Sequence, residues 1–151
     1  MNMKTLFHGD GYREIESRFL ALRPDAGAEW GKMHVAQMLA HCRVTMEVAT
    51  GLVELPPSLM GKLIGRWFRR KFSDDSRLSR NSPTHPRFVM TEQKDFAAER
   101  DRLLQLIRQF AEGGEANCTG RPHSFFGPLS SEEWGRGMYK HLDHHLRQFG
   151  A

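Results

Sequence analysis

Apolar residues recur every three or four positions along four stretches of the chain, the spacing at which side chains share one face of an α-helix. The first stretch predicts a helix over residues 12–22, ended by Pro24, with a stripe formed by Ile15, Phe19 and Leu22. The second predicts a helix over residues 33–50, ended by Gly51, with a stripe formed by Met33, Gln37, Ala40, His41, Val44 and Val48. Each of these helices would bury one face.

Two further stretches continue the pattern. Thr91 is expected to cap a helix that stops at Gly113, with an apolar face formed by Phe96, Leu103, Leu106, Ile107 and Phe110. Ser130 and Glu133 have the spacing of a capping box, which predicts the start of a final helix that reaches Gln148. No alternation of apolar and polar residues typical of a strand accompanies these helices.

The connection between the second and third of these helices is long. Pro56 opens a segment through Phe72 that predicts a shorter, partly buried helix, read as an insertion or lid, with a stripe formed by Leu59, Leu63, Trp67 and Phe72. Residues 73–90 lack periodicity and predict an irregular loop, and loops of that length are often functional. Residues 118–128 predict a second irregular stretch.

These elements favour an all-α fold. Four principal helices predict an antiparallel four-helix bundle, with an extra short helix and a long loop between helices two and three. A chain of 151 residues is close to the commonest domain size, so we expect residues 1–151 to form a single domain.

Composition narrows the expected location. No run approaches the roughly 20 apolar residues that span a bilayer, and the first residues lack the apolar region of a signal peptide. We therefore expect a cytoplasmic protein without a membrane partner. Cys42 and Cys118 are far apart and not in a Cys-x-x-Cys spacing, so we interpret both as free thiols.

The net charge of +4 invites a nucleic-acid interpretation, but much of the excess is local. It is concentrated in Arg66, Arg69, Arg70 and Lys71. Such a cluster is more typical of a solvated helix end or of a site for an anionic small molecule. Arg66, Arg69 and Arg70 are therefore candidates for holding an anionic cofactor, and nucleic acid is not the expected partner.

Histidines on the final helix carry the most specific chemical signal. His141 and His145 are four residues apart, so their side chains lie one turn apart on the same face, which Trp134 and Met138 mark as buried. In a bundle the natural partner is the second helix, whose stripe contains His41. Three imidazoles would then converge and leave a position open for water or substrate, the pattern of a catalytic zinc or similar site. Gln37 and Gln148 could orient the rings or a water.

Other readings of the histidines stay open. A buried histidine is often only a hydrogen-bonded core residue. His34 lies about 10.5 Å along the axis from His41, which makes it a lesser candidate for the same ion. His144 points about 100° away from the pair, toward solvent or toward a supporting position. The remaining histidines, in terminal or loop segments, are expected to be solvated: His8, His85 and His123.

At these residues the chain resembles the DinB-like superfamily, a set of four-helix bundle proteins with a three-histidine metal centre. Trp30-Gly-Lys-Met33 followed by Gln37-Met-Leu-Ala-His41 is similar to the tryptophan and second-helix histidine of that superfamily. His141-x-x-x-His145-Leu-Arg-Gln148 is similar to its final histidine pair. The resemblance implies that His41, His141 and His145 hold a divalent metal, most simply zinc or nickel. Leu-Arg-Gln in place of the usual Arg-Gly-Gln, and the long connection over residues 51–90, suggest an uncharacterised branch.

Characterised relatives in that superfamily include enzymes that use low-molecular-weight thiols, so the resemblance also implies a thiol-dependent transferase or isomerase acting on small molecules. A metal-assisted hydrolase is a neighbouring hypothesis, although no carboxylate except Glu47 lies near the stripe. A third hypothesis is a non-catalytic metal-binding or stress-response bundle. No catalytic residue is assigned, and pairing into a homodimer stays open.

Overall fold

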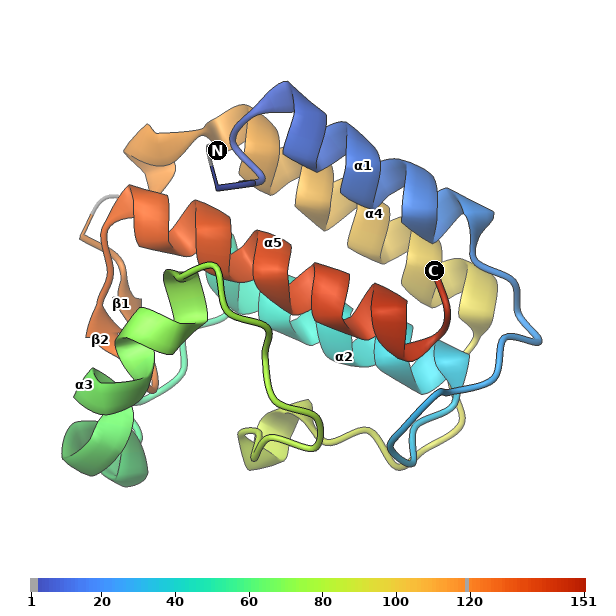
Figure 1. The fold of residues 1–151 in the computed structure, drawn as a ribbon, viewed down its shortest axis with the longest axis horizontal. Coiled ribbons are helices and arrows are strands. Elements are labelled where there is room, and N and C mark those ends of the chain that lie inside the picture. The colour runs from blue at the N-terminus through green and yellow to red at the C-terminus, as the bar shows by residue number, and fades with distance from the viewer. Residues whose placement is uncertain (1–2, 119) are drawn as a thin grey trace.

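The structure is a computed structural model that describes residues 3–118 and 120–151, and it is mostly helical (Figure 1). The α-helices are α1 (Gly9–Ala21), α2 (Val35–Ala49), α3 (Leu59–Ser73), α4 (Phe96–Gly113) and α5 (Ser131–Gln148). Two short 3₁₀ helices (Pro86–Phe88 and Glu115–Asn117) and two short strands, β1 (Pro122–His123) and β2 (Gly127–Pro128), complete the described elements. None of the described helices is long and apolar enough to cross a membrane.

Four of the helices enclose the core. Helix α2 contacts α4 and α5, and α1 contacts the same two helices from the other side. The enclosed side chains are apolar and include Ile15, Phe19, Met38, Leu106 and Leu142, all without exposed surface. Burial of these stripes is the main favourable term in folding and explains why the three- and four-residue spacing located the helices.

The helix ends were predicted to within a few residues, with one instructive exception. Ser130 accepts from the Glu133 backbone and Glu133 reaches back to Ser130, as the capping box predicts. Helix α4 begins later than expected, because Asp95 rather than Thr91 supplies the cap, accepting a hydrogen bond from Ala98 N at 2.7 Å. Both residue types suit the position, so the sequence alone did not distinguish them.

Helix α3 corrects the expectation of a partly buried apolar stripe. Leu59, Leu63 and Trp67 are 78%, 79% and 84% exposed, whereas Phe72 is buried. The face turned toward the body instead carries Gly61 and Gly65, where an added Cβ would lie 2.3 and 2.2 Å from the carbonyl oxygen of Phe125. Close contact through glycines turns the large apolar side chains of α3 outward.

A small hairpin corrects the expectation of no strands. β1 and β2 pair antiparallel, and the turn between them is held by His123 Nδ1, which accepts from Phe125 N and Phe126 N. The ring of His123 stacks near Phe72 and Trp134, with centroids 5.4 and 5.3 Å away. His123 is therefore packed rather than solvated, and burial lowers its pKa to about 4.

Candidate metal centre

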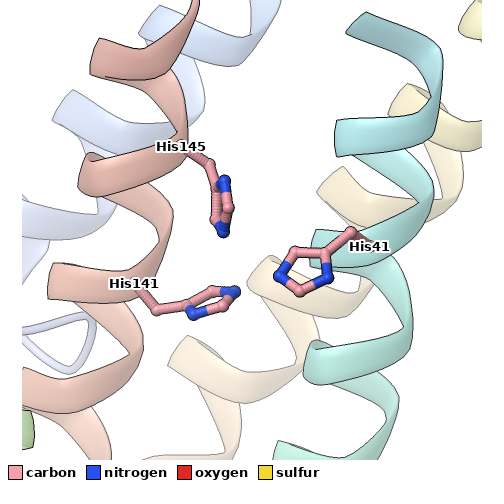
Figure 2. Close-up of side chains that lie close together, drawn as sticks. All are labelled: His41, His141 and His145. Atoms are coloured by element: carbon pink, nitrogen blue, oxygen red, sulfur yellow. The ribbon is translucent and has the colours of Figure 1, made fainter. Parts of the chain in front are cut away.

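Three imidazole rings meet between helices α2 and α5. His41 reaches across from α2, and His141 and His145 lie one turn apart on α5 (Figure 2). The ring centroids are 5.2 Å apart for His41 and His141, 4.6 Å for His41 and His145, and 4.8 Å for His141 and His145. One nitrogen from each ring lies within 4.8 Å of the others. The three candidate ligands predicted from the sequence are thus brought together.

The proton on His41 is placed by a backbone contact. His41 is 4% exposed, and its Nδ1 lies 2.8 Å from the carbonyl oxygen of Phe88. A carbonyl oxygen only accepts hydrogen bonds, so Nδ1 must carry the hydrogen in the neutral ring. Nε2 therefore keeps its lone pair, and Figure 2 shows this second nitrogen directed toward the rings of α5.

A similar argument fixes His145 through a glutamine. Nδ1 of His145 lies 2.8 Å from Gln148 Oε1, and Gln148 Nε2 donates to the Trp30 carbonyl oxygen at 2.8 Å. The Trp30 carbonyl oxygen can only accept, which orients the amide so that its oxygen faces the histidine. His145 Nδ1 is then the donor, and Nε2 is the free lone pair. Gln148 therefore orients a ring, as the sequence predicts.

His141 is held less firmly than the other two rings. Its Nε2 lies 3.4 Å from Thr45 Oγ1, whose hydrogen is donated to the Cys42 carbonyl oxygen at 2.8 Å. His141 is also only partly buried, whereas His41 and His145 are buried. Of the three histidines, His141 is therefore the one that retains some exposed surface.

The surroundings keep the rings uncharged. Burial lowers the pKa of all three, to about 3 for His145, and the neighbouring rings lower the pKa of His141 and His145 further because two imidazolium ions would repel. All three histidines are therefore neutral near pH 7, the state in which imidazole binds metals.

The rim of the cluster is aromatic and cationic. The His144 ring lies 5.4 Å from that of Trp30 and 5.1 Å from that of His145, so it flanks the site rather than joining it. The Arg80 guanidinium lies 4.3 Å from the Trp30 ring. Arg80 and Phe88 both belong to the irregular stretch after α3, which therefore contributes both to the rim and to the orientation of His41.

Other predicted candidates lie elsewhere. His34 is exposed just before α2, and Gln37 bonds to His34 N and the Glu92 carbonyl oxygen rather than to a ring. Cys42 is buried in the core, as expected, and burial raises the pKa of its thiol. Glu47 forms an ion pair with Arg43 at 2.8 Å.

The arginines proposed for an anionic cofactor are not gathered at the histidines. Arg69 forms an ion pair with Glu133 at 2.6 Å, at the first turn of α5. Glu133 precedes His141 by eight residues, which is about 12 Å along the helix axis. Arg66 and Arg70 are exposed.

Sequence reasoning missed two groups that position the rings, the carbonyl oxygens of Phe88 and Trp30. Every residue has a carbonyl, so residue type carries no signal for such a contact. The Trp30 segment was noticed for its indole, whereas its contact with Gln148 is made by the backbone.

The comparisons with known proteins correct the resemblance drawn from the histidine motifs. The DinB-like identification is wrong, because the family model that matches is a different one and no DinB-like family matches. Short helical motifs produced the likeness, since any two adjacent helices can present a histidine pair to a third histidine. No curated protein and no solved structure matches the chain. The match spans residues 10–151, so the chain belongs to the family described as Protein of unknown function (DUF1569).

Proposed function

We propose that the protein binds one divalent transition-metal ion through Nε2 of His41 and His145 and a ring nitrogen of His141, and that the ion serves a reaction on a small molecule. Zinc and nickel suit an all-imidazole donor set best. The frame that holds the donors is, in this proposal, an antiparallel four-helix bundle of α1, α2, α4 and α5. The geometry of the cluster supports this function, and the family, being one of unknown function, adds nothing to it.

The observation that carries the proposal is the commitment of the two Nδ1 hydrogens. The Phe88 carbonyl oxygen and Gln148 Oε1 each take one hydrogen bond from a ring, at 2.8 Å, which leaves the Nε2 lone pairs of His41 and His145 without a proton. Histidine ligands of metals commonly donate their other N–H to a carbonyl or a similar acceptor. A core histidine that served packing alone would have no need for its second nitrogen to face two other imidazoles.

The spacing of the rings supports the same conclusion. Nitrogens bound to zinc at about 2.0 to 2.1 Å in a tetrahedral site lie roughly 3.4 Å apart. The candidate nitrogens lie within 4.8 Å of one another, so small rotations of the side chains would bring them to an ion. The cluster includes no carboxylate among the described residues, so a divalent ion would keep its full charge and attract an anionic ligand.

Three protein ligands favour a reactive site over a purely structural one. A structural zinc site uses four protein ligands, whereas a catalytic site leaves a position for water or substrate. When bound, such an ion polarises a substrate oxygen or lowers the pKa of a bound water. The chain's own contribution is to orient the rings through Phe88 and Gln148 and to offer the Thr45 hydroxyl oxygen, beside His141, as an acceptor.

A thiol cofactor has no independent support. The expectation rested on the DinB-like resemblance, which is wrong, and Arg69 is engaged by Glu133. Metal-assisted chemistry on a small molecule is therefore proposed without a thiol. The assignment of Arg66, Arg69 and Arg70 to an anionic cofactor stays a prediction.

Metal content tests the proposal. Protein purified without an affinity metal column would be assayed by mass spectrometry for the wild type, for single alanine variants of the three histidines, and for His8→Ala as an exposed control. We expect close to one equivalent in the wild type and His8→Ala, and a loss in the other variants with the helical circular dichroism unchanged. No metal in the wild type and no uptake of offered zinc or nickel would refute the site.

A second measurement distinguishes a metal site with an open coordination position from one without it. Cobalt(II) would be substituted, and its visible spectrum recorded with and without a small coordinating anion such as azide. A spectral change that saturates with the anion is expected from an open position. An unchanged spectrum would favour the non-catalytic metal-binding alternative.

A further inference from the structure

Helix α3 presents an apolar surface that the metal centre does not use. Six of its large apolar side chains are exposed, from 38% for Ile64 to 84% for Trp67. They are Leu59, Met60, Leu63, Ile64, Trp67 and Phe68, and we call them the α3 apolar face. A contiguous group of this kind on a protein surface marks an interaction site.

The helix divides into three sectors when each residue is turned by about 100°. The α3 apolar face occupies a sector of roughly half the circumference. Gly61, Gly65 and Phe72 occupy a narrow sector that lies against the body of the protein. Lys62 and Arg66 occupy a third sector of about 40° beside the apolar face, whereas Arg70 and Lys71 fall within the sector of that face, at the C-terminal end of the helix.

The charge on α3 has one sign. The helix carries five cationic residues and no acidic one: Lys62, Arg66, Arg69, Arg70 and Lys71. Within residues 3–118 and 120–151, Arg69 is the one member of this set with an ion pair, to Glu133. The other four are exposed. Large apolar side chains beside unneutralised cations are the composition of helices that lie in the surface of anionic membranes.

We propose that α3 docks the protein on an anionic lipid bilayer, with the apolar face inserted at the level of the headgroups and the cations against lipid phosphates. Trp67, the most exposed of the apolar residues, is of the type enriched at membrane interfaces. The long side chains of Arg70 and Lys71, at the C-terminal end of the helix, can reach the headgroups while their stems remain in the apolar layer.

The docking element is held in place before binding. Ser58 caps α3 by accepting from Gly61 N at 3.2 Å, and its own N–H donates to the Ser124 carbonyl oxygen at 2.7 Å. The Arg69–Glu133 ion pair ties the C-terminal half of the helix to α5. Because the helix is already formed, binding does not bear the full cost of folding it.

A second copy of this chain fits the surface less well. Symmetric pairing would place identical patches against one another, and the cations that border the apolar face would then meet like charges. A bilayer containing anionic lipids offers acyl chains to the apolar face of α3 and negative charge to its cations. Surface docking differs from spanning, and the expectation of no membrane partner rested on the lack of a spanning segment.

Vesicle flotation tests the proposal with the full chain. The vesicles would contain either phosphatidylcholine alone or equal parts of phosphatidylcholine and phosphatidylglycerol. We expect flotation with the anionic vesicles, weakened by high salt, and little with the neutral ones. Loss of the apolar contact in Leu63→Gln/Trp67→Gln would abolish flotation, and these exposed positions leave the core intact.

A matched pair of variants isolates the position of the charges. Arg66→Gln/Arg70→Gln and Lys32→Gln/Arg102→Gln both remove two exposed cations, but only the first pair lies on α3. At about fivefold in partitioning per cation near the surface, the first variant would weaken binding about 25-fold, whereas the second would stay within twofold.

Three results would overturn the inference. The first is an equal loss of vesicle binding in the two charge variants, and the second is no flotation of the wild type. The third is a wild-type protein that does not bind vesicles but forms a dimer, which Leu63→Gln/Trp67→Gln no longer forms. Light scattering after size exclusion would detect the last of these. The metal content of every variant should equal that of the wild type, which separates a failure of this proposal from a failure of the metal site.

Discussion

Replacing Gln148 by methionine should weaken metal binding without removing a ligand. Methionine is unbranched and of similar length, so it fills the space of the glutamine but accepts no strong hydrogen bond. The substitution removes the acceptor for His145 Nδ1 and the donor to the Trp30 carbonyl oxygen, both at 2.8 Å. The ring of His145 then loses the contact that fixes its tautomer and direction.

The expected size of the effect follows from these two contacts. Loss of a group that orients a metal-bound histidine reduces affinity by roughly 10- to 100-fold, or about 1.4 to 2.7 kcal/mol. Gln148 is only 4% exposed, so water replaces its hydrogen bonds poorly. Leaving buried polar groups unpaired should also lower the free energy of unfolding by about 1 to 3 kcal/mol.

Gln37 provides a matched control. It is also a buried glutamine and also makes two hydrogen bonds, but both are to backbone groups, those of His34 and Glu92. Gln37→Met should therefore cost similar stability while leaving the zinc dissociation constant nearly unchanged. Competition titration against a chromophoric chelator measures the dissociation constant, and urea unfolding of the metal-free proteins measures stability.

Two outcomes would refute this reasoning. One is a folded Gln148→Met protein that binds zinc as tightly as the wild type. The other is an equal loss of affinity in Gln37→Met, since that would trace the effect to general destabilisation rather than to the orientation of His145.

Three further predictions concern stability. Zinc at a hundredfold excess over its dissociation constant should raise the free energy of unfolding by about 2.7 kcal/mol and the melting temperature by roughly 5 to 10 °C. Calorimetry should show no rise in melting temperature for His141→Ala if that ring is a ligand. Burial lowers the pKa of His145 from its ordinary value of 6.5 to about 3, so its contribution to the free energy of unfolding of the metal-free protein is fully present above pH 6.5 and falls by about 2 kcal/mol by pH 5; urea unfolding at the two pH values checks this, and His145→Gln should lose less. Gly65→Ala should cost about 1 to 3 kcal/mol and expose α3 to proteases, because its Cβ would meet the Phe125 carbonyl oxygen at 2.2 Å; Gly27→Ala, with no atom within 4 Å of its Cβ, should do neither.

The histidine cluster was predictable because two simple periodicities specify it. A four-residue separation places His141 and His145 on one face, and the apolar stripes of α2 and α5 require those faces to meet. The sequence also marked Gln148, which follows His145 by three residues and thus lies on the same side. Whether the cluster holds a metal stays a prediction that the metal measurement decides.

The exposed stripe of α3 was not predictable from spacing. A stripe of large apolar residues predicts that a helix buries that face within its own domain. The same stripe also occurs on helix faces that stay exposed and serve as interaction surfaces. The decisive feature is the close approach of the Phe125 backbone to Gly61 and Gly65, two residues that a hydropathy pattern scores as neutral. Short motifs within single helices likewise produced the DinB-like resemblance, which the family assignment overturned.

The sequence by itself determined where the helices form and which faces α1, α2, α4 and α5 bury, because side chains three and four positions apart interact within the helix. It also determined that His141 and His145 lie one turn apart on the same helix face. Only the tertiary structure decided which groups accept a hydrogen bond from the rings of His41 and His145, which side of α3 meets the body, and that His123 packs between aromatic rings. Those outcomes depend on contacts between segments distant in sequence, and backbone groups that are identical in every residue make many of them.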